Sequence, residues 1–137
     1  MVMQVTVRDE STDGRTVGET VVEFLTERVT VEELIRSRVY QEVQDFNQRK
    51  PERFCGLVRP TDAESDLNGF KLETPRTIDW KEQFEAAKRA FTRNQVLILV
   101  DDRQVERLDE TIDLRPGTAE RAATTVTFLK LTPLIGG

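Results

Sequence analysis

The chain has 137 residues, of which 37% are hydrophobic and 33% are charged, and it can form one domain with its own core. Its net charge of −5 argues against a nucleic-acid partner or an anionic membrane, because both are bound by clustered Lys and Arg. The absence of histidine excludes Ser-His-Asp and Cys-His catalysis and a histidine-rich metal site. No apolar run approaches the roughly 20 residues of a membrane span, and the first residues hold no signal-peptide core. We therefore expect a cytoplasmic protein.

The first two predicted elements are strands that pair as a hairpin. Alternating side chains over QVTVRDES, residues 4–11, indicate the first strand. The pair Asp13-Gly14 is a strong turn signal, and TVVEFLTE, residues 20–27, is typical of the second strand. The side chains expected to face inward are Val5, Val7, Val22 and Phe24.

A long amphipathic helix follows the predicted hairpin. Thr30 and Glu33 have the spacing of a capping box, in which each side chain bonds an unpaired backbone N–H of the first turn. Apolar residues then recur at spacings of three and four, which predicts a helix of about four to five turns. This stripe consists of Val31, Leu34, Ile35, Val39, Val43 and Phe46. Arg49, Lys50 and Pro51 favour an end to the helix there.

The periodic pattern is lost from Pro51 to about Thr77, where prolines and glycines punctuate a polar stretch. We expect an ordered insert, because four apolar side chains could still pack: Phe54, Leu57, Val58 and Phe70. Its TDAESDLNG run is similar in order to a calcium loop but lacks the closing Glu, so it is interpreted as a solvated acidic loop. The single Cys55 lacks a histidine base and cannot form an internal disulfide, which fits a structural or incidental thiol in a reducing cytosol.

A second helix is predicted over DWKEQFEAAKRAFTRN, residues 79–94. Asp79 and Glu82 have the spacing of another capping box. Four side chains share one face of this helix: Trp80, Phe84, Ala87 and Phe91. Such an aromatic stripe usually faces a core, and a helix that binds in the groove of a partner is the alternative. We expect Trp80, Phe84 and Phe91 to pack against the fold.

The last third of the chain is predicted to return to strands. The unbroken apolar run 96–100 indicates a central strand that is covered on both faces. A turn at 101–102 leads into a short return strand at 103–105, and 108–117 is predicted to be a connection with a helical turn at most. A final strand is expected over 124–131, with Val126 and Phe128 facing inward.

This order of elements resembles the β-grasp fold of ubiquitin and its relatives. LILVDDRQVERLDETIDLRPG, TVTFLKL and a final Gly-Gly look like the second half of that family, and TVEELI is similar to the start of its central helix. The resemblance covers roughly 2–49 and 95–137, while 118–124 is interpreted as a second, small insertion. It implies an α+β fold in one ubiquitin-like domain, 1–137, whose central helix packs on a mixed sheet. The insert at about 50–94 would carry the second helix, and 132–137 would form a flexible tail.

The function that the resemblance implies lies at the tail. In the family, an ATP-using activating enzyme adenylates the last glycine, which here is Gly137. A ubiquitin-like modifier passes its carboxyl through cysteine thioesters to an amine of a target protein with the help of conjugating enzymes, and deconjugating peptidases remove it again. A sulfur carrier becomes a thiocarboxylate instead, and LTPLIGG is similar to the end of the molybdopterin synthase small subunit. The chain itself would be no enzyme and would bind no cofactor or metal.

Three functional hypotheses remain open at this point. The first is a modifier, and the excess of arginine over lysine and the missing histidine suggest a bacterial one of the kind found in antiphage operons. The second is a sulfur carrier, which is usually shorter than this chain. The third is a β-grasp interaction module whose glycines carry no chemistry.

The tail has the residue types that adenylation requires. Without Cβ atoms, Gly136 and Gly137 could approach a nucleotide site through a narrow channel. Side chains expected to contact the activating enzyme are Leu131, Pro133, Leu134 and Ile135, with the proline stiffening the extended tail. A modifier also needs a recognition patch, which in ubiquitin lies on the solvent face of the sheet. Here Leu97, Leu99, Leu129 and Leu131 could form that face, or the helix at 79–93 could cover it.

Overall fold

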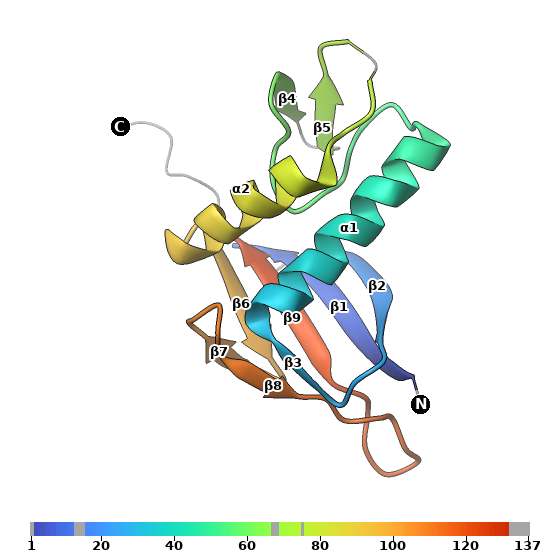
Figure 1. Cartoon of the computed structure of the whole chain (residues 1–137), viewed down its shortest axis with the longest axis vertical. Coiled ribbons are helices and arrows are strands. Elements are labelled where there is room, and N and C mark those ends of the chain that lie inside the picture. Colours follow the sequence, from blue (N-terminus) through green and yellow to red (C-terminus); the bar gives the residue numbers. More distant parts are fainter. Residues whose placement is uncertain (1, 13–15, 67–68, 75, 132–137) are drawn as a thin grey trace. The chain divides into compact units, whose positions relative to one another are not determined.

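The computed structural model describes residues 2–12, 16–66, 69–74 and 76–131 (Figure 1). The chain divides into two compact units, one made of residues 1–34 and 91–137 and the other of residues 35–90. The first unit contains β1 (Met3–Ser11), β2 (Thr16–Phe24), β3 (Arg28–Thr30), β6 (Val96–Val100), β7 (Arg103–Val105), β8 (Thr111–Asp113) and β9 (Thr125–Lys130). The second contains β4 (Ala63–Asp66) and β5 (Gly69–Leu72), and the helices α1 (Val31–Arg49) and α2 (Trp80–Thr92) each run from one unit into the other.

The first unit is built on a mixed sheet of five strands in the order β2-β1-β9-β6-β7. The strands β1 and β2 form the predicted antiparallel hairpin. The strand β9 lies parallel to β1 on one side and antiparallel to β6 on the other, so the first and last strands of the chain are neighbours within the sheet (Figure 1). This mixed α+β architecture is compatible with a β-grasp.

One face of the sheet carries the core of this unit. The strands alternate, as a period of two requires, between buried and more exposed side chains. The buried set confirms every inward-facing residue predicted for the outer hairpin and the last strand, and it consists of Met3, Val5, Val7, Val22, Phe24, Val96, Ile98, Val100, Val126 and Phe128.

The prediction for the run 96–100 was right about the position of the strand and wrong about its burial. The strand β6 is internal, because it lies between β9 and β7. It is not buried on both faces, because Leu97 and Leu99 are only half-buried. An unbroken apolar run marks an internal strand here, but the alternation is hidden because leucine occupies the less buried positions.

A second, two-stranded sheet corrects the prediction for 108–117. That segment contains β8, which pairs antiparallel with β3, so it is not a connection with a helical turn at most. Val29 lies opposite Ile112 in this pair, and both side chains are buried. Strands of three residues carry too little alternation to be recognised in a sequence, and their stability comes from the burial of this distant apolar pair.

The start and end of α1 follow the predicted signals. The backbone N–H of Glu33 donates to Thr30 Oγ1 at 3.1 Å, and the N–H of Thr30 donates to Glu33 Oε2 at 3.0 Å, which confirms the capping box. The helix ends at Arg49, and Lys50 takes a left-handed φ of 46° before Pro51. All six residues of the predicted stripe are buried.

The second unit contains a hairpin that the sequence did not reveal. The strands β4 and β5 pair antiparallel, so the acidic run expected to be a loop is a strand over Ala63–Asp66. The bridge between Phe54 and Phe70 extends this pairing. Phe54 and Leu57 are buried, and Val58 and Phe70 are half-buried, which confirms that this segment is ordered and that its apolar side chains pack.

The predicted capping box of α2 forms only in part. The N–H of Lys81 donates to Asp79 Oδ1 at 3.0 Å, so Asp79 caps the helix. The carboxylate of Glu82 instead accepts the hydroxyl of Thr61 at 2.7 Å, which ties the helix to the insert. The buried side of α2 is centred on Gln83, Ala87, Ala90 and Phe91.

Polar side chains of α1 and α2 hold the backbone of the insert. Glu42 Oε1 accepts the N–H of Leu57 at 3.0 Å, and Gln83 Nε2 donates to the carbonyl of Val58 at 3.0 Å. Gln83 is 2% exposed, so its amide is a buried polar group whose hydrogen bond offsets the cost of burial. In the part of the chain that is described, neither helix is long and apolar enough to cross a membrane.

Candidate functional site

The candidate site predicted from the sequence is the segment after β9. Five of its six residues, Pro133, Leu134, Ile135, Gly136 and Gly137, lie outside the described residues. Leu131 is described, directly follows β9 and is half-buried. Of this candidate site, the structure therefore describes only Leu131 and the strand β9 that precedes it.

The end of β9 is paired with both of its neighbouring strands, β1 and β6. Lys130 lies opposite Ser11 of β1 and opposite Val96 of β6. The N–H of Leu131 donates to the carbonyl of Gln95 at 3.1 Å, so the ladder continues one residue beyond the strand. Leu131 is thus fixed by the backbone, and the tail begins from an anchored position.

The four leucines predicted to form a recognition face share the side of the sheet opposite the core. Leu97 lies directly opposite Leu129 in the β6–β9 pair. Leu99, two residues further along β6, lies opposite Thr127. All four leucines, including Leu131, are half-buried. They form a leucine face, which we define as Leu97, Leu99, Leu129 and Leu131, and it leads to the start of the tail.

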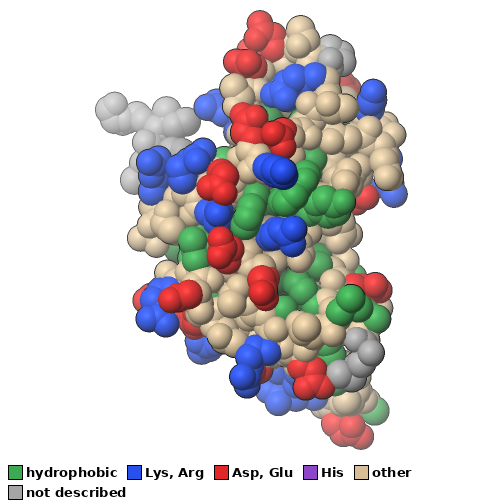
Figure 2. All heavy atoms as spheres, in the orientation of Figure 1, with side chains coloured by type: hydrophobic (Ala, Val, Ile, Leu, Met, Phe, Trp, Pro, Cys, Tyr) green, Lys and Arg blue, Asp and Glu red, His purple; other side chains and the backbone are tan. Residues whose placement is uncertain are grey.

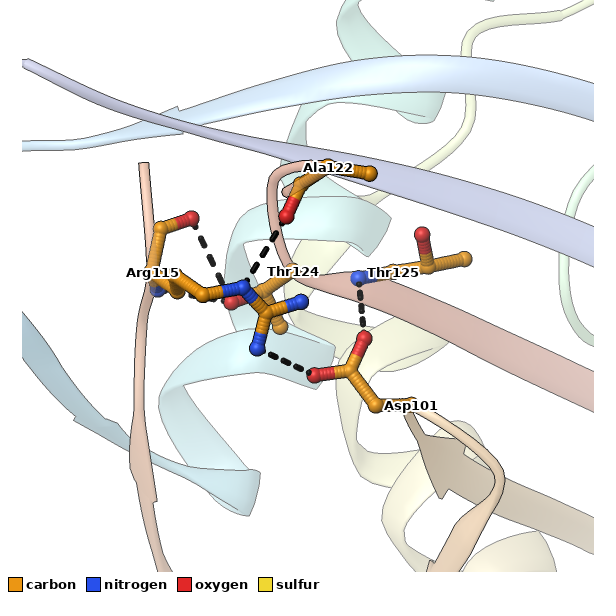
Figure 3. A network of polar contacts seen from close by, with 5 residues as sticks. All are labelled: Asp101, Arg115, Ala122, Thr124 and Thr125. Atoms are coloured by element: carbon orange, nitrogen blue, oxygen red, sulfur yellow. Dashed lines mark hydrogen bonds and ion pairs between the residues drawn. The ribbon is translucent and has the colours of Figure 1, made fainter. Parts of the chain in front are cut away.

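A polar network fixes the other end of β9 (Figure 3). The carboxylate of Asp101 accepts the N–H of Thr125 at 3.1 Å and the guanidinium of Arg115 at 3.0 Å. Arg115 also donates from Nε to the carbonyl of Ala122 at 2.9 Å. Two hydrogen bonds between Arg115 and Thr124 close the intervening loop: the Thr124 N–H donates to Arg115 O at 3.0 Å, and the Arg115 N–H donates to Thr124 Oγ1 at 2.7 Å. The network sets where the last strand begins.

The electrostatics of this network favour the ionised form of Asp101. Its partial burial would raise the pKa of the carboxyl. The hydrogen bonds from Arg115 and from the N–H of Thr125, together with the charges of Arg115 and Arg121, outweigh burial and leave the pKa of Asp101 below its ordinary value. Asp101 and Asp102 have left-handed φ angles of 47° and 73°, as a tight two-residue hairpin turn requires.

Sequence reasoning missed the role of this network. It assigned Asp101 only to a turn and interpreted 118–124 only as a small insertion. The available signal was the Asp-Asp turn itself, since such a turn places a carboxylate beside the neighbouring strand. The partner Arg115 lies too far along the chain for any spacing rule to connect the two.

The aromatic residues of the second unit form a cluster on the helices. Trp80 meets Tyr40 edge to face, with ring centroids 5.2 Å apart, and stacks on Phe84 at 6.3 Å. Arg36 lies over the ring of Trp80 and Lys88 over that of Phe84. Trp80 and Phe84 are half-buried, so the expected packing is partial for them, whereas Phe91 is buried as predicted.

Charged side chains of both signs are interspersed on the face that Figure 2 shows, and hydrophobic side chains gather over the helix pair there. Among the described residues, no group of three or more Asp, Glu or Cys side chains is placed to hold a metal ion. Cys55 is exposed.

Comparison with known proteins returns no match. No protein-family model, no curated protein and no solved structure matches this chain.

Proposed function

We propose that this chain is a β-grasp protein modifier whose terminal carboxylate, on Gly137, is adenylated by an ATP-using activating enzyme and then transferred to a target protein. The observation that carries the proposal is the central position of β9, parallel to β1, with the Thr-Pro-Leu-Ile-Gly-Gly segment directly after the anchored Leu131. The anchored end of β9 fixes the point from which the tail departs, so an activating enzyme that recognises the sheet could take up the tail from one starting position.

The chemistry of the tail supports transfer of the carboxyl group. Adenylation places the Gly137 carboxylate at the α-phosphate of ATP and releases pyrophosphate. Glycine at both final positions lets the backbone approach closely, and β-strand addition to the partner would hold the segment. The leucine face lies on the neighbouring strands β6 and β9 and on Leu131, and it is the recognition surface that we propose for activating and conjugating enzymes.

A sulfur carrier is the second candidate, and the LTPLIGG sequence favours it. Such a carrier begins with the same adenylate but exchanges AMP for sulfur, so that the tail ends in a thiocarboxylate. The two functions therefore share the first step and differ in the acceptor.

Mass spectrometry after co-expression with the flanking genes tests both. Trypsin cleaves after Lys130, so a modifier leaves the remnant Leu131–Gly137 on a lysine of its target. A carrier instead yields the free peptide with one oxygen replaced by sulfur. An unchanged carboxylate with every activating enzyme tested would contradict both functions and favour a plain interaction module.

Two glycine-to-alanine variants, one in the tail and one as its control, test the role of Gly137. Gly137→Ala is expected to abolish the adduct because its Cβ would crowd the channel to the nucleotide. Gly18→Ala adds the same methyl group in β2, where an ideal Cβ meets no atom within 4 Å, and it is expected to leave the adduct unchanged. An adduct that persists in Gly137→Ala would contradict the proposed role of the tail.

A further inference from the structure

The strand β2 forms one edge of the five-stranded sheet (Figure 1). It pairs with β1 along one side and has no strand partner on its other side among the described residues. The pairing is regular from Gly18 to Phe24, and the only register shift lies nearer the turn. An edge of this length is a template for a further strand.

The hydrogen bonds of β1 determine which of its residues face β2. The N–H of Thr6 donates to the carbonyl of Thr124 at 3.1 Å, so the polar backbone groups of Thr6 point toward β9. Successive residues of a strand point their backbone groups to opposite sides. Those of Val5 and Val7 therefore point toward β2.

The same alternation determines the free edge of β2. Val22 and Thr20 lie opposite these two β1 residues, so they use their N–H and C=O groups within the hairpin. The residues between and beside them, Glu19, Val21 and Glu23, point their backbone groups away from the sheet. These three alternate residues offer the backbone donors and acceptors that an added strand needs.

The side chains at these outward positions carry a charge pattern. Glu19, Val21 and Glu23 are exposed, and Val21 is 47% exposed. Glu19 is an ion-pair partner of Arg8 at 3.3 Å, whereas Glu23 lies opposite the uncharged Gln4. The edge therefore presents an apolar side chain between two carboxylates, and the negative charge is less compensated at Glu23.

This pattern disfavours a second copy of the chain as the occupant. If two β2 strands paired antiparallel about a twofold axis at Val21, Glu19 of each copy would lie opposite Glu23 of the other. Like charges that are directly opposite destabilise a strand pair. A segment with cations at those positions gains from the same geometry.

We propose that the β2 edge binds an extended segment of another protein, with an apolar residue opposite Val21 and Lys or Arg two residues to either side. The added strand would pair its backbone with Glu19, Val21 and Glu23 and place its cations opposite the two carboxylates. The proposal does not depend on the proposed chemistry of the tail, because no tail residue contributes to this edge.

Amide hydrogen exchange with a synthetic probe tests the proposal. The probe is acetyl-Thr-Lys-Thr-Val-Thr-Lys-Thr-amide, and its counterpart has Glu in place of both Lys. In the free chain, the amides of Glu19, Val21 and Glu23 are expected to exchange faster than those of Thr20 and Val22. Addition of the probe is expected to slow the three outward amides, and the counterpart is expected to leave them unchanged.

Two substitutions of Val21 test whether its outward N–H group takes part in binding. Val21→Pro removes only an outward N–H, a change that an edge strand tolerates, and it is expected to weaken probe binding roughly tenfold or more. Val21→Thr keeps the N–H and is expected to bind within about twofold of wild type. Circular dichroism of both variants checks that the fold is retained.

Several results would overturn the proposal. One is equal binding of the probe and its Glu counterpart, and another is unchanged binding in a folded Val21→Pro variant. Protection of the outward amides that rises with protein concentration alone would show that a second copy occupies the edge instead. No protection at millimolar probe would show that the edge does not accept this class of segment.

Discussion

The side-chain amide of Asn47 makes two hydrogen bonds to the backbone of a single residue, Ile78. The N–H of Ile78 donates to Asn47 Oδ1 at 2.8 Å, and Asn47 Nδ2 donates to the carbonyl of Ile78 at 2.9 Å. The asparagine thus acts as a strand partner would, and it ties α1 to the segment that enters α2. Ile78 is buried, so these backbone groups depend on Asn47 for their hydrogen bonds.

Asn47→Ala is expected to destabilise the second unit by about 1–2 kcal/mol, because it leaves both backbone groups of Ile78 unpaired. Trp80 is the only tryptophan, so its fluorescence during urea unfolding reports on this unit. The control Gln48→Ala changes an exposed neighbour on the same helix and is expected to stay within about 0.5 kcal/mol of wild type. Equal effects of the two substitutions would contradict the role assigned to Asn47.

Phe128→Ala tests the core of the sheet. The side chain of Phe128 is 0% exposed in the middle strand, opposite Ile98 of β6. Its loss is expected to cost about 3–5 kcal/mol, because it removes buried area and leaves a cavity. Leu25→Ala removes a side chain that is 83% exposed and is expected to cost less than about 0.5 kcal/mol. Urea unfolding followed by circular dichroism measures both, and a loss below about 1 kcal/mol for Phe128→Ala would contradict this packing.

Gly56→Ala tests a close approach in the insert. A Cβ at this position would overlap the ring of Phe54 and lie 3.0 Å from Glu42 Oε1, which accepts the N–H of Leu57. Displacing the buried ring is expected to cost about 1–3 kcal/mol, observed as a lower urea midpoint of Trp80 fluorescence. Gly18→Ala is again the control, since its Cβ would meet open space. If Gly56→Ala has the same urea midpoint as the control, the ring of Phe54 can move aside without a loss of stability, which would contradict the close approach.

The elements that could be predicted from the sequence are those whose signals are local. The stripe of α1 and its capping box depend on residues three or four apart, and the alternation at Val5 and Val7 needs only one strand. The pairs β3–β8 and β4–β5 have strands of three or four residues, too short for a period to stand out. Their positions depend on partners that lie elsewhere in the chain.

The polar contacts were missed for the same reason. Glu82 has the spacing of a capping box, yet its carboxylate bonds Thr61, because folding brings the insert beside the start of α2. Gln83 was unremarkable in the sequence and is buried against the carbonyl of Val58. For the candidate site, the tail was proposed from its residue types and the resemblance to the β-grasp family, whereas the network that fixes the start of β9 joins Asp101 and Arg115 only in three dimensions.

Asp101→Asn tests that network through its pH dependence. The pKa of Asp101 in the folded chain lies below the ordinary value of 3.8, so ionised Asp101 stabilises the fold. This contribution is fully present above the unfolded pKa and is lost as the pH falls through the folded pKa. At neutral pH the substitution is expected to cost only about 0.5–1 kcal/mol, because the side chain of Asp101 is 37% exposed and solvent screens the pair. Asparagine also tolerates the left-handed φ of 47°, so the turn should be retained.

The measurement compares urea midpoints of wild type and Asp101→Asn at a series of pH values. The difference is expected to be constant above about pH 5 and to shrink steadily below about pH 4, as Asp101 becomes protonated and loses its charge-assisted bond with Arg115. Asp102→Asn provides the matched control, since Asp102 lies next in the same turn, also has a left-handed φ and is exposed. A difference for Asp101→Asn that does not change with pH would show that the carboxylate charge contributes nothing to holding the start of β9.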